Sequence, residues 1–241
     1  MTKITLKNKS SIEQIEERFD NDVERFSNLE SGQVATIDAP LTMELITRAA
    51  LATTHPITKV LDIGCGAGNN TIKLLELSGI FDSVLVDLSE NMLVRAKVRV
   101  LEAGARSVRT IKQDFRTLDV EPGSVDIILA AAVLHHLRDD QDWRRGFEKL
   151  YTLLRVGGSI WVTDLVSHDS PAIQEMMWAR YGDYLVSVGG EAYRDKVFNY
   201  IEIEDSPRSL QYQLKLLKVV GFSQVEVLHK NGCFAAFGGI K

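Results

Sequence analysis

The sequence predicts an α/β fold in which a mostly parallel sheet carries helices on both faces and ends in an antiparallel β-hairpin. Short apolar runs alternate with amphipathic segments over residues 58–164, as expected for parallel strands joined by helices. Three glycines at alternate positions follow the first run and indicate a tight turn from strand to helix. Near the end, Asn231-Gly232 separates two strand-like runs, which is a strong hairpin signal.

Residues 1–55 are expected to form a helical cap in front of the main domain, which spans 56–241. Apolar side chains recur at spacings of three and four along residues 11–30 and predict one amphipathic helix. These side chains are Ile12, Ile15, Phe19, Val23 and Phe26. A second helix is expected over 41–51, with Pro40 near its first turn.

In the main domain, apolar runs predict the strands and amphipathic runs predict the helices. The expected strands cover residues 58–62, 83–87, 108–113, 125–130 and 159–164. The expected helices cover 70–78, 90–103, and a segment that begins at a cap, Asp139 or Asp140, and ends at Leu154. Ser89 is the expected cap of the helix over 90–103, and Gly157-Gly158 is expected to turn the chain into the fifth strand.

The C-terminal part is expected to contain a lid and the hairpin. Residues 166–206 are too long for a plain connection and hold four of the six tyrosines. We expect them to form a helical lid insertion, whose aromatic side chains suit an apolar or ring-bearing ligand. A helix is then expected over 208–219, followed by strands over 223–228 and 233–237.

The glycine turn has the form D-x-G-x-G-x-G, made of Asp62, Gly64, Gly66 and Gly68. The dinucleotide fingerprint would need glycine at position 69, where Asn69 stands. The turn, the strand–helix alternation and the final hairpin together resemble the class I S-adenosylmethionine (SAM) dependent methyltransferases. The resemblance implies a Rossmann-like fold with a seven-stranded sheet. It also implies an enzyme that moves a methyl group from SAM to an O, N, S or C nucleophile of a small metabolite by in-line displacement, leaving S-adenosylhomocysteine (SAH).

This resemblance, together with the needs of the cofactor, predicts where SAM binds. The glycine turn with Cys65 would pass close to the methionyl part, and Asp62 would reach the ammonium group, often through water. Asp87 ends the second strand and would accept hydrogen bonds from both ribose hydroxyls. Ala130 would contact the methionyl tail through its backbone. Arg25 is a candidate partner for the carboxylate of the tail.

The adenine ring needs an apolar slot and a polar partner for its amino group. Leu88 and Met92 follow the ribose-binding acid and are expected to face the ring, with core packing as the alternative for Met92. The resemblance places Asp114 near the adenine amine and Phe115 beside the ring. The alternative for Asp114 is a solvated loop acid.

Catalytic candidates lie where the fourth and fifth strands end, because ligands bind at this edge of an open α/β sheet. His135 and His136 follow the fourth strand, and histidine titrates near neutrality. Either could contact the substrate or act as a general base, or could pack and cap the fold. Asp164 ends the fifth strand and could be a base, a substrate anchor or a structural acceptor. No spacing typical of a metal site is present, so no metal is expected.

Bulk properties restrict the partners. The 241-residue chain has a formal net charge of −5 and no dense Lys/Arg block, which argues against a nucleic-acid substrate without excluding one. No apolar run approaches the ~20 residues of a membrane span. Two isolated cysteines, Cys65 and Cys233, are typical of a reducing cytoplasm. The oligomeric state is left open, with a homodimer among the options.

The C-terminal half is also similar to the carboxy-SAM synthases, through residues 217–226 and the Cys-Phe strand that follows. That family holds an extra carboxylate with an Arg and a Tyr. Here Ser206 falls at the Arg position, although Arg208 is near, and residues 36–41 contain no Tyr. An ordinary methyltransferase for a small metabolite is therefore favoured. A tRNA-directed methyltransferase and a non-catalytic SAM-binding module are the further alternatives.

Overall fold

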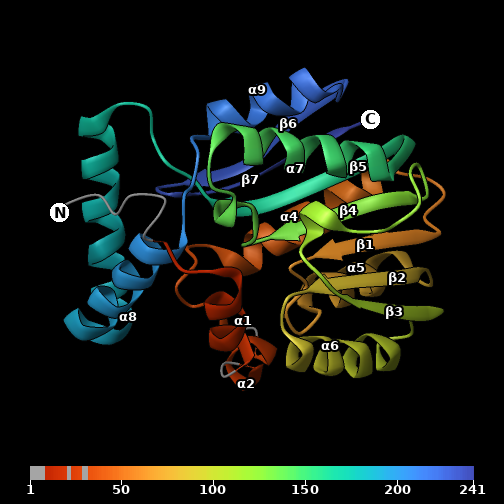
Figure 1. Cartoon of the computed structure of the whole chain (residues 1–241), viewed down its shortest axis with the longest axis horizontal. Helices are drawn as coiled ribbons and strands as arrows, with labels where there is room; N and C mark the ends of the chain where they lie inside the picture. Colours follow the sequence, from red (N-terminus) through yellow and green to blue (C-terminus); the bar gives the residue numbers. More distant parts are fainter. Residues whose placement is uncertain (1–8, 21–22, 29–31) are drawn as a thin grey trace.

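The computed structural model describes residues 9–20, 23–28 and 32–241, and its centre is a seven-stranded sheet (Figure 1). The strands are β1 (Lys59–Ile63), β2 (Asp82–Asp87), β3 (Ser107–Lys112), β4 (Val125–Ala131), β5 (Leu154–Leu165), β6 (Gln224–Asn231) and β7 (Phe234–Ile240). Their order across the sheet is β3-β2-β1-β4-β5-β7-β6. All neighbours are parallel except β7, which runs antiparallel to β5 and β6. The predicted fold class is confirmed.

Helices cover both faces of the sheet. Successive side chains along each strand point to opposite faces, so the sheet contributes to one apolar core on each side. On one face, Leu129 of β4 packs in a cluster with residues of α4 (Ala39–Thr53), α5 (Asn69–Ser78) and α6 (Glu90–Glu102). On the other face, Ile128 packs in a cluster with residues of α7 (Asp140–Leu153) and α9 (Leu210–Val220). Strands buried on both faces explain the continuous apolar runs of the sequence.

Helix caps fix where three of these helices begin. The hydroxyl of Ser89 accepts a hydrogen bond from the backbone N–H of Met92 at 3.1 Å and caps α6, as predicted. Of the two candidates for α7, Asp139 is the cap, since its carboxylate accepts from the N–H of Asp142 at 2.8 Å. Ser209 caps α9 in the same way.

Two predicted elements differ from the structure. The helix expected over 11–30 is two helices, α1 (Ile12–Asp20) and α2 (Val23–Ser27), and parts of this range lie outside the described residues. Gly157-Gly158 does not turn the chain between helix and strand, because β5 already begins at Leu154. The register of β4 and β5 shifts here instead, where the Asp126 carboxylate pairs with Arg155.

Residues after β5 form α8 (Pro171–Glu204), whose helical geometry breaks at Gly190, with φ 79° and ψ 179°. Only glycine adopts such a backbone readily, so the two halves of α8 meet at this residue. In Figure 1, α8 and α1 lie beside the edge toward which the arrowheads of the parallel strands point. The hydroxyls of Tyr181 and Tyr184 donate to the carbonyls of Ala35 and Val34, both at 2.9 Å, which ties α8 to the N-terminal segment. None of the described helices has the length and apolar character needed to cross a bilayer.

Candidate functional site

A cavity of about 480 Å³ lies at the carboxyl edge of the parallel strands. Its walls come from the glycine turn after β1, the ends of β2, β4 and β5, and residues of α1, α4 and α8. Eight of the predicted cofactor residues line it: Gly64, Cys65, Gly66, Asp87, Leu88, Met92, Asp114 and Phe115. The three predicted catalytic residues, His135, His136 and Asp164, also line it. Asp62, Gly68 and Ala130 are not among the lining residues, whereas Ala131 and Ala132 are.

The three glycines of the turn all have positive φ, but they serve different purposes. A Cβ at Gly64 would come within 2.8 Å of Val133, and one at Gly68 would come within 2.8 Å of Val100. These two glycines therefore allow close packing of the turn. A Cβ at Gly66 would meet nothing within 4 Å, so the absent side chain there leaves free space in the cavity wall. A ligand can approach the backbone at Gly66.

Asp87 joins the glycine turn to the end of β2. Its Oδ2 accepts a hydrogen bond from the N–H of Gly66 at 2.8 Å, and its Oδ1 accepts from the N–H of Ser89 at 3.0 Å. Burial raises the pKa of Asp87, and the backbone hydrogen bonds work against that shift. The carboxylate lines the cavity and keeps lone pairs for further donors.

Asp62 lies behind the turn and is fully buried. Its Oδ2 accepts from the Thr71 hydroxyl at 2.7 Å, whereas its Oδ1 has no hydrogen-bond partner among the described residues. Burial, with a smaller contribution from the charge of Asp87, raises the pKa of Asp62 to about 7. An unpaired buried carboxylate oxygen behind an open glycine turn fits the ammonium group of a SAM tail reached through water.

At the position predicted to bind adenine, the carboxylate of Asp114 is already engaged. Arg116 donates from Nε to both of its oxygens, at 2.9 and 3.0 Å, and from Nη1 to Asp142 at 2.7 Å. These carboxylates raise the pKa of Arg116. Arg116 also lines the cavity, and the sequence offered no signal for it. Leu88, Met92 and Phe115 supply the apolar surface nearby.

The predicted catalytic residues belong to the part of the wall that follows β4 and β5. His135 and His136 lie in the short 3-10 helix Leu134–His136, directly after β4. The backbone N–H of His135 donates to Asp164 Oδ2 at 3.1 Å, and its Nδ1 is hydrogen-bonded to Asp164 Oδ1. Burial by itself lowers the pKa of His135, but the carboxylates of Asp164 and Asp205 outweigh it and raise the pKa to about 9.

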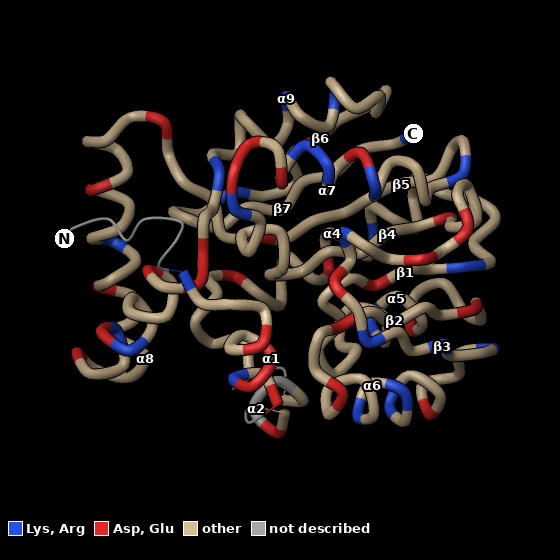
Figure 2. The backbone as a smooth tube through the Cα atoms, in the orientation of Figure 1, with Lys and Arg blue, Asp and Glu red and all other residues tan. Residues whose placement is uncertain are grey.

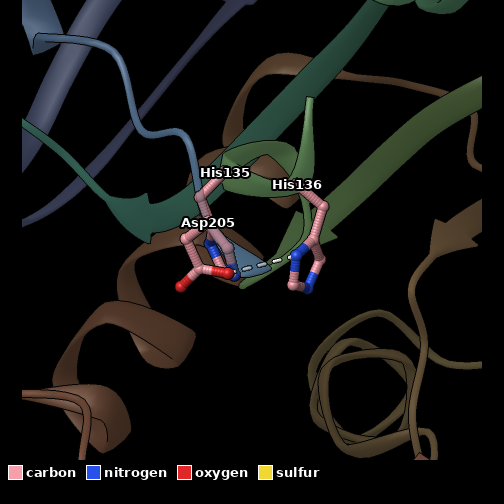
Figure 3. Close-up of side chains that lie close together, drawn as sticks. All are labelled: His135, His136 and Asp205. Carbon is pink, nitrogen blue, oxygen red and sulfur yellow. Dashed lines mark ion pairs between the residues drawn. The ribbon is translucent and has the colours of Figure 1, made fainter. Parts of the chain in front are cut away.

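Asp205 is the main residue that sequence reasoning missed. It follows α8, seventy residues after His135, and is only 5% exposed. Its Oδ1 lies 3.2 Å from His136 Nδ1 and 3.7 Å from His135 Nε2 (Figure 3). Burial favours the neutral acid, but the nearby histidines lower the pKa of Asp205. Only the fold reveals this neighbour, because no local motif links a residue after the lid to the turn after β4.

The remaining wall is largely apolar and aromatic. It includes Ile15, Phe19, Tyr181, Tyr200, Ile201 and Phe234. Arg18 lies over the rings of Phe19 and Tyr200, at 4.3 and 5.1 Å from their centroids, and pairs with Glu204. Arg18 is a second lining residue that the sequence did not indicate, whereas the side chain of the proposed Arg25 lies outside the described residues.

Comparisons with known proteins point to SAM-dependent enzymes. Residues 60–158 match a family model described as a methyltransferase domain. A demethylmenaquinone methyltransferase from Listeria welshimeri is 28% identical over 189 residues, which cover 76% of this chain and 78% of that protein. A carboxy-S-adenosyl-L-methionine synthase from Nautilia profundicola is 24% identical over 188 residues, covering 76% and 77% respectively.

The fold also resembles that of solved structures. One is phosphoethanolamine N-methyltransferase 2 from Haemonchus contortus, in complex with phosphomonomethylethanolamine and SAH. It aligns with a TM-score of 0.59 and 21% identity over 90% of this chain. The present chain spans 46%, about half, of that larger chain.

Proposed function

We propose that this chain is a class I SAM-dependent methyltransferase and that it methylates a small, mostly apolar or aromatic acceptor. The observation that carries this proposal is one cavity with two different ends. One end is the open glycine turn with Asp87, and the other is the polar wall of His135, His136 and Asp164 beneath aromatic side chains. Cofactor and acceptor would meet between these ends.

At the cofactor end, the residues would bind and orient. SAM supplies a methyl group on a positively charged sulfur, so displacement needs alignment more than activation. Gly66 leaves space for the ligand to lie against the backbone, and Asp87 offers oxygens for a pair of hydroxyls. Asp62 keeps one unpaired oxygen behind the turn. Leu88 and Met92 provide the apolar contact that an adenine ring requires.

At the acceptor end, the histidines would hold the nucleophilic atom. The Asp164 carboxylate fixes the ring of His135 through Nδ1, so the Nε2 side of the ring is oriented by the fold. Because two carboxylates stabilise its charged form, His135 would carry a proton near neutral pH and would donate a hydrogen bond to an oxygen of the acceptor. Aromatic neighbours such as Tyr181 and Phe19 would pack on the body of the acceptor.

The relative from Listeria welshimeri suggests the first acceptor to test, since its name specifies demethylmenaquinone, a ring-bearing apolar molecule. The protein should be incubated with methyl-labelled SAM and either reduced demethylmenaquinone or fractionated metabolite extracts. Transfer of label to a small molecule supports the proposal. SAH binding without any label transfer, across all fractions, would instead favour a non-catalytic SAM-binding module.

A second candidate function, carboxy-SAM synthesis, is favoured by one relative and by the guanidinium of Arg18 at the cavity wall. Ser206, at the position expected to carry an Arg, cannot supply a positive charge. Mass spectrometry after incubation with SAM and prephenate separates this function from methyl transfer. For a tRNA substrate we find no comparable observation among the described residues, where Lys and Arg are interspersed with Asp and Glu (Figure 2).

A further inference from the structure

We propose that His135, His136 and Asp205 form a binding site for a divalent transition-metal ion at the acceptor end of the cavity. The site deepens the proposed function, and it rests on that function only for the identity of the molecule that the ion would contact. One ligand atom from each of the three residues lies within 4.8 Å of the other two. All three residues line the cavity.

The distances suit three ligands of one ion. Asp205 Oδ1 is 3.2 Å from His136 Nδ1 and 3.7 Å from His135 Nε2. Two ligands held about 2.1 Å from the same ion lie roughly 3.0–3.5 Å apart. The side chains would therefore need to move by only a few tenths of an ångström to about one ångström. Figure 3 shows the Asp205 carboxylate and the His136 ring directed toward one another, with His135 beside them.

Two of the ligand atoms have no partner besides each other. His136 Nδ1 and Asp205 Oδ1 are buried and form an ion pair at 3.2 Å, and within the described part of the chain neither has a further hydrogen-bond partner. Buried polar atoms with so few partners are costly in free energy. A shared ion would satisfy both atoms at once.

The surroundings hold the ligands in place. Asp164 binds Nδ1 of His135, which is the arrangement that commonly orients a metal-binding histidine through its second nitrogen. The backbone N–H of Ser206 donates to the carbonyl of His135 at 2.7 Å. This hydrogen bond ties the segment that carries Asp205 to the turn that carries the histidines.

The chemistry of the ligands favours particular ions. Two imidazoles and one carboxylate suit Zn²⁺, Fe²⁺ or Co²⁺ better than Mg²⁺ or Ca²⁺, which prefer oxygen ligands. The positive charges of Arg18, on α1, and Arg138, in the turn before α7, act on Asp205. They partly offset the negative charge that Asp164 and Asp205 place beside the histidines. Three protein ligands leave coordination positions for water or for an oxygen of the acceptor. The ion would thereby orient an oxygen-bearing acceptor beside the cofactor.

Cobalt titration of tag-free, chelator-treated protein tests the site, with visible absorbance as the readout and Zn²⁺ competition as confirmation. We expect saturation at one ion per chain. The variants His136→Ala and Asp205→Asn should each weaken binding by about tenfold or more. His168→Ala is the matched control, because His168 lies outside the cavity lining, and it should bind Co²⁺ like the wild type.

SAH binding by calorimetry, measured on every variant, shows whether the protein is folded and whether the cofactor end works. Absence of saturable Co²⁺ binding to wild-type protein that binds SAH would overturn the metal site and leave the proposed methyl transfer intact. Equal Co²⁺ affinity in the wild type and in both ligand variants would also overturn it. If Asp205→Asn does not fold, His136→Ala and His136→Gln carry the test.

Discussion

At the scale of single residues, Gly66 is the position where the absence of a side chain matters for ligand binding. Replacing it with valine should fill the open wall and reduce SAH affinity at least tenfold. The backbone has φ 50°, so the substitution also strains the chain by about 1–2 kcal/mol. Gly123→Val is the control, since Gly123 has φ 68°, an equally open Cβ position and no place in the cavity lining. Calorimetry with SAH compares the two, and equal affinities would show that the turn does not hold the cofactor.

Asp87 should contribute most of the polar recognition of the cofactor. Asp87→Ala removes charge-assisted hydrogen bonds worth about 1.5–3 kcal/mol, so SAH affinity should fall by about ten- to a hundredfold. Asp82→Ala is the matched control at the other end of β2, where the carboxylate pairs with Arg106 away from the cavity. Unchanged SAH affinity in a folded Asp87→Ala protein would contradict the assigned role.

At the scale of elements, the Asp126 carboxylate connects three strands. It accepts hydrogen bonds from the N–H groups of Thr58 and Lys59, both at 2.7 Å, and it pairs with Arg155 at the start of β5. Burial alone would raise the pKa of Asp126, but these partners lower it. Because the pKa is lowered in the folded state, the ionised carboxylate stabilises the fold when the pH is above the ordinary Asp pKa near 4. This contribution is lost as the pH falls through the lowered pKa.

Asp126→Asn should therefore lower the free energy of unfolding by about 1–3 kcal/mol at pH 7. The difference from the wild type should shrink at pH 3, because protonation below the usual range near 4 begins to remove the contribution of the charged form. Urea denaturation at the two pH values measures this. Asp119→Asn, at an exposed acid in the loop between β3 and β4, serves as the control and should show little difference at either pH. A constant difference would mean that shape, not charge, explains the loss.

Elements with a strong local signal could be predicted from the sequence, and others could not. Apolar runs, Ser89 and Asn231-Gly232 located strands, a cap and the hairpin, because each acts through its immediate neighbours. The early start of β5 depends on Arg155 meeting Asp126, which lies 29 residues away. The division of the helix expected over 11–30 likewise had no signal in its apolar spacing.

At the scale of the whole molecule, the candidate site was predictable where its residues come from consecutive segments of the chain. The glycine turn and Asp87 belong to consecutive strand–helix units, and His135 and His136 follow β4 directly. Asp205 and Arg18 were not predicted, because they reach the cavity only after α8 and α1 fold against the sheet edge. Arg116 lies beside the predicted Asp114 and Phe115 after β3, but it belongs to no local motif. The acceptor end is assembled from distant segments, so the sequence alone says least about the acceptor.

If one cavity binds the cofactor across these segments, occupancy should stabilise the whole chain. SAH at a hundred times its dissociation constant adds about 2.7 kcal/mol to folding stability. For a domain of this size, each 1 kcal/mol raises Tm by about 2–4 °C, so scanning calorimetry should show a rise of about 5–10 °C. Adenosine diphosphate, which lacks the methionyl tail, should give a much smaller shift. Stabilisation by a dinucleotide instead of SAH would contradict the assigned cofactor, because the turn carries Asn69 where a dinucleotide-binding loop requires glycine.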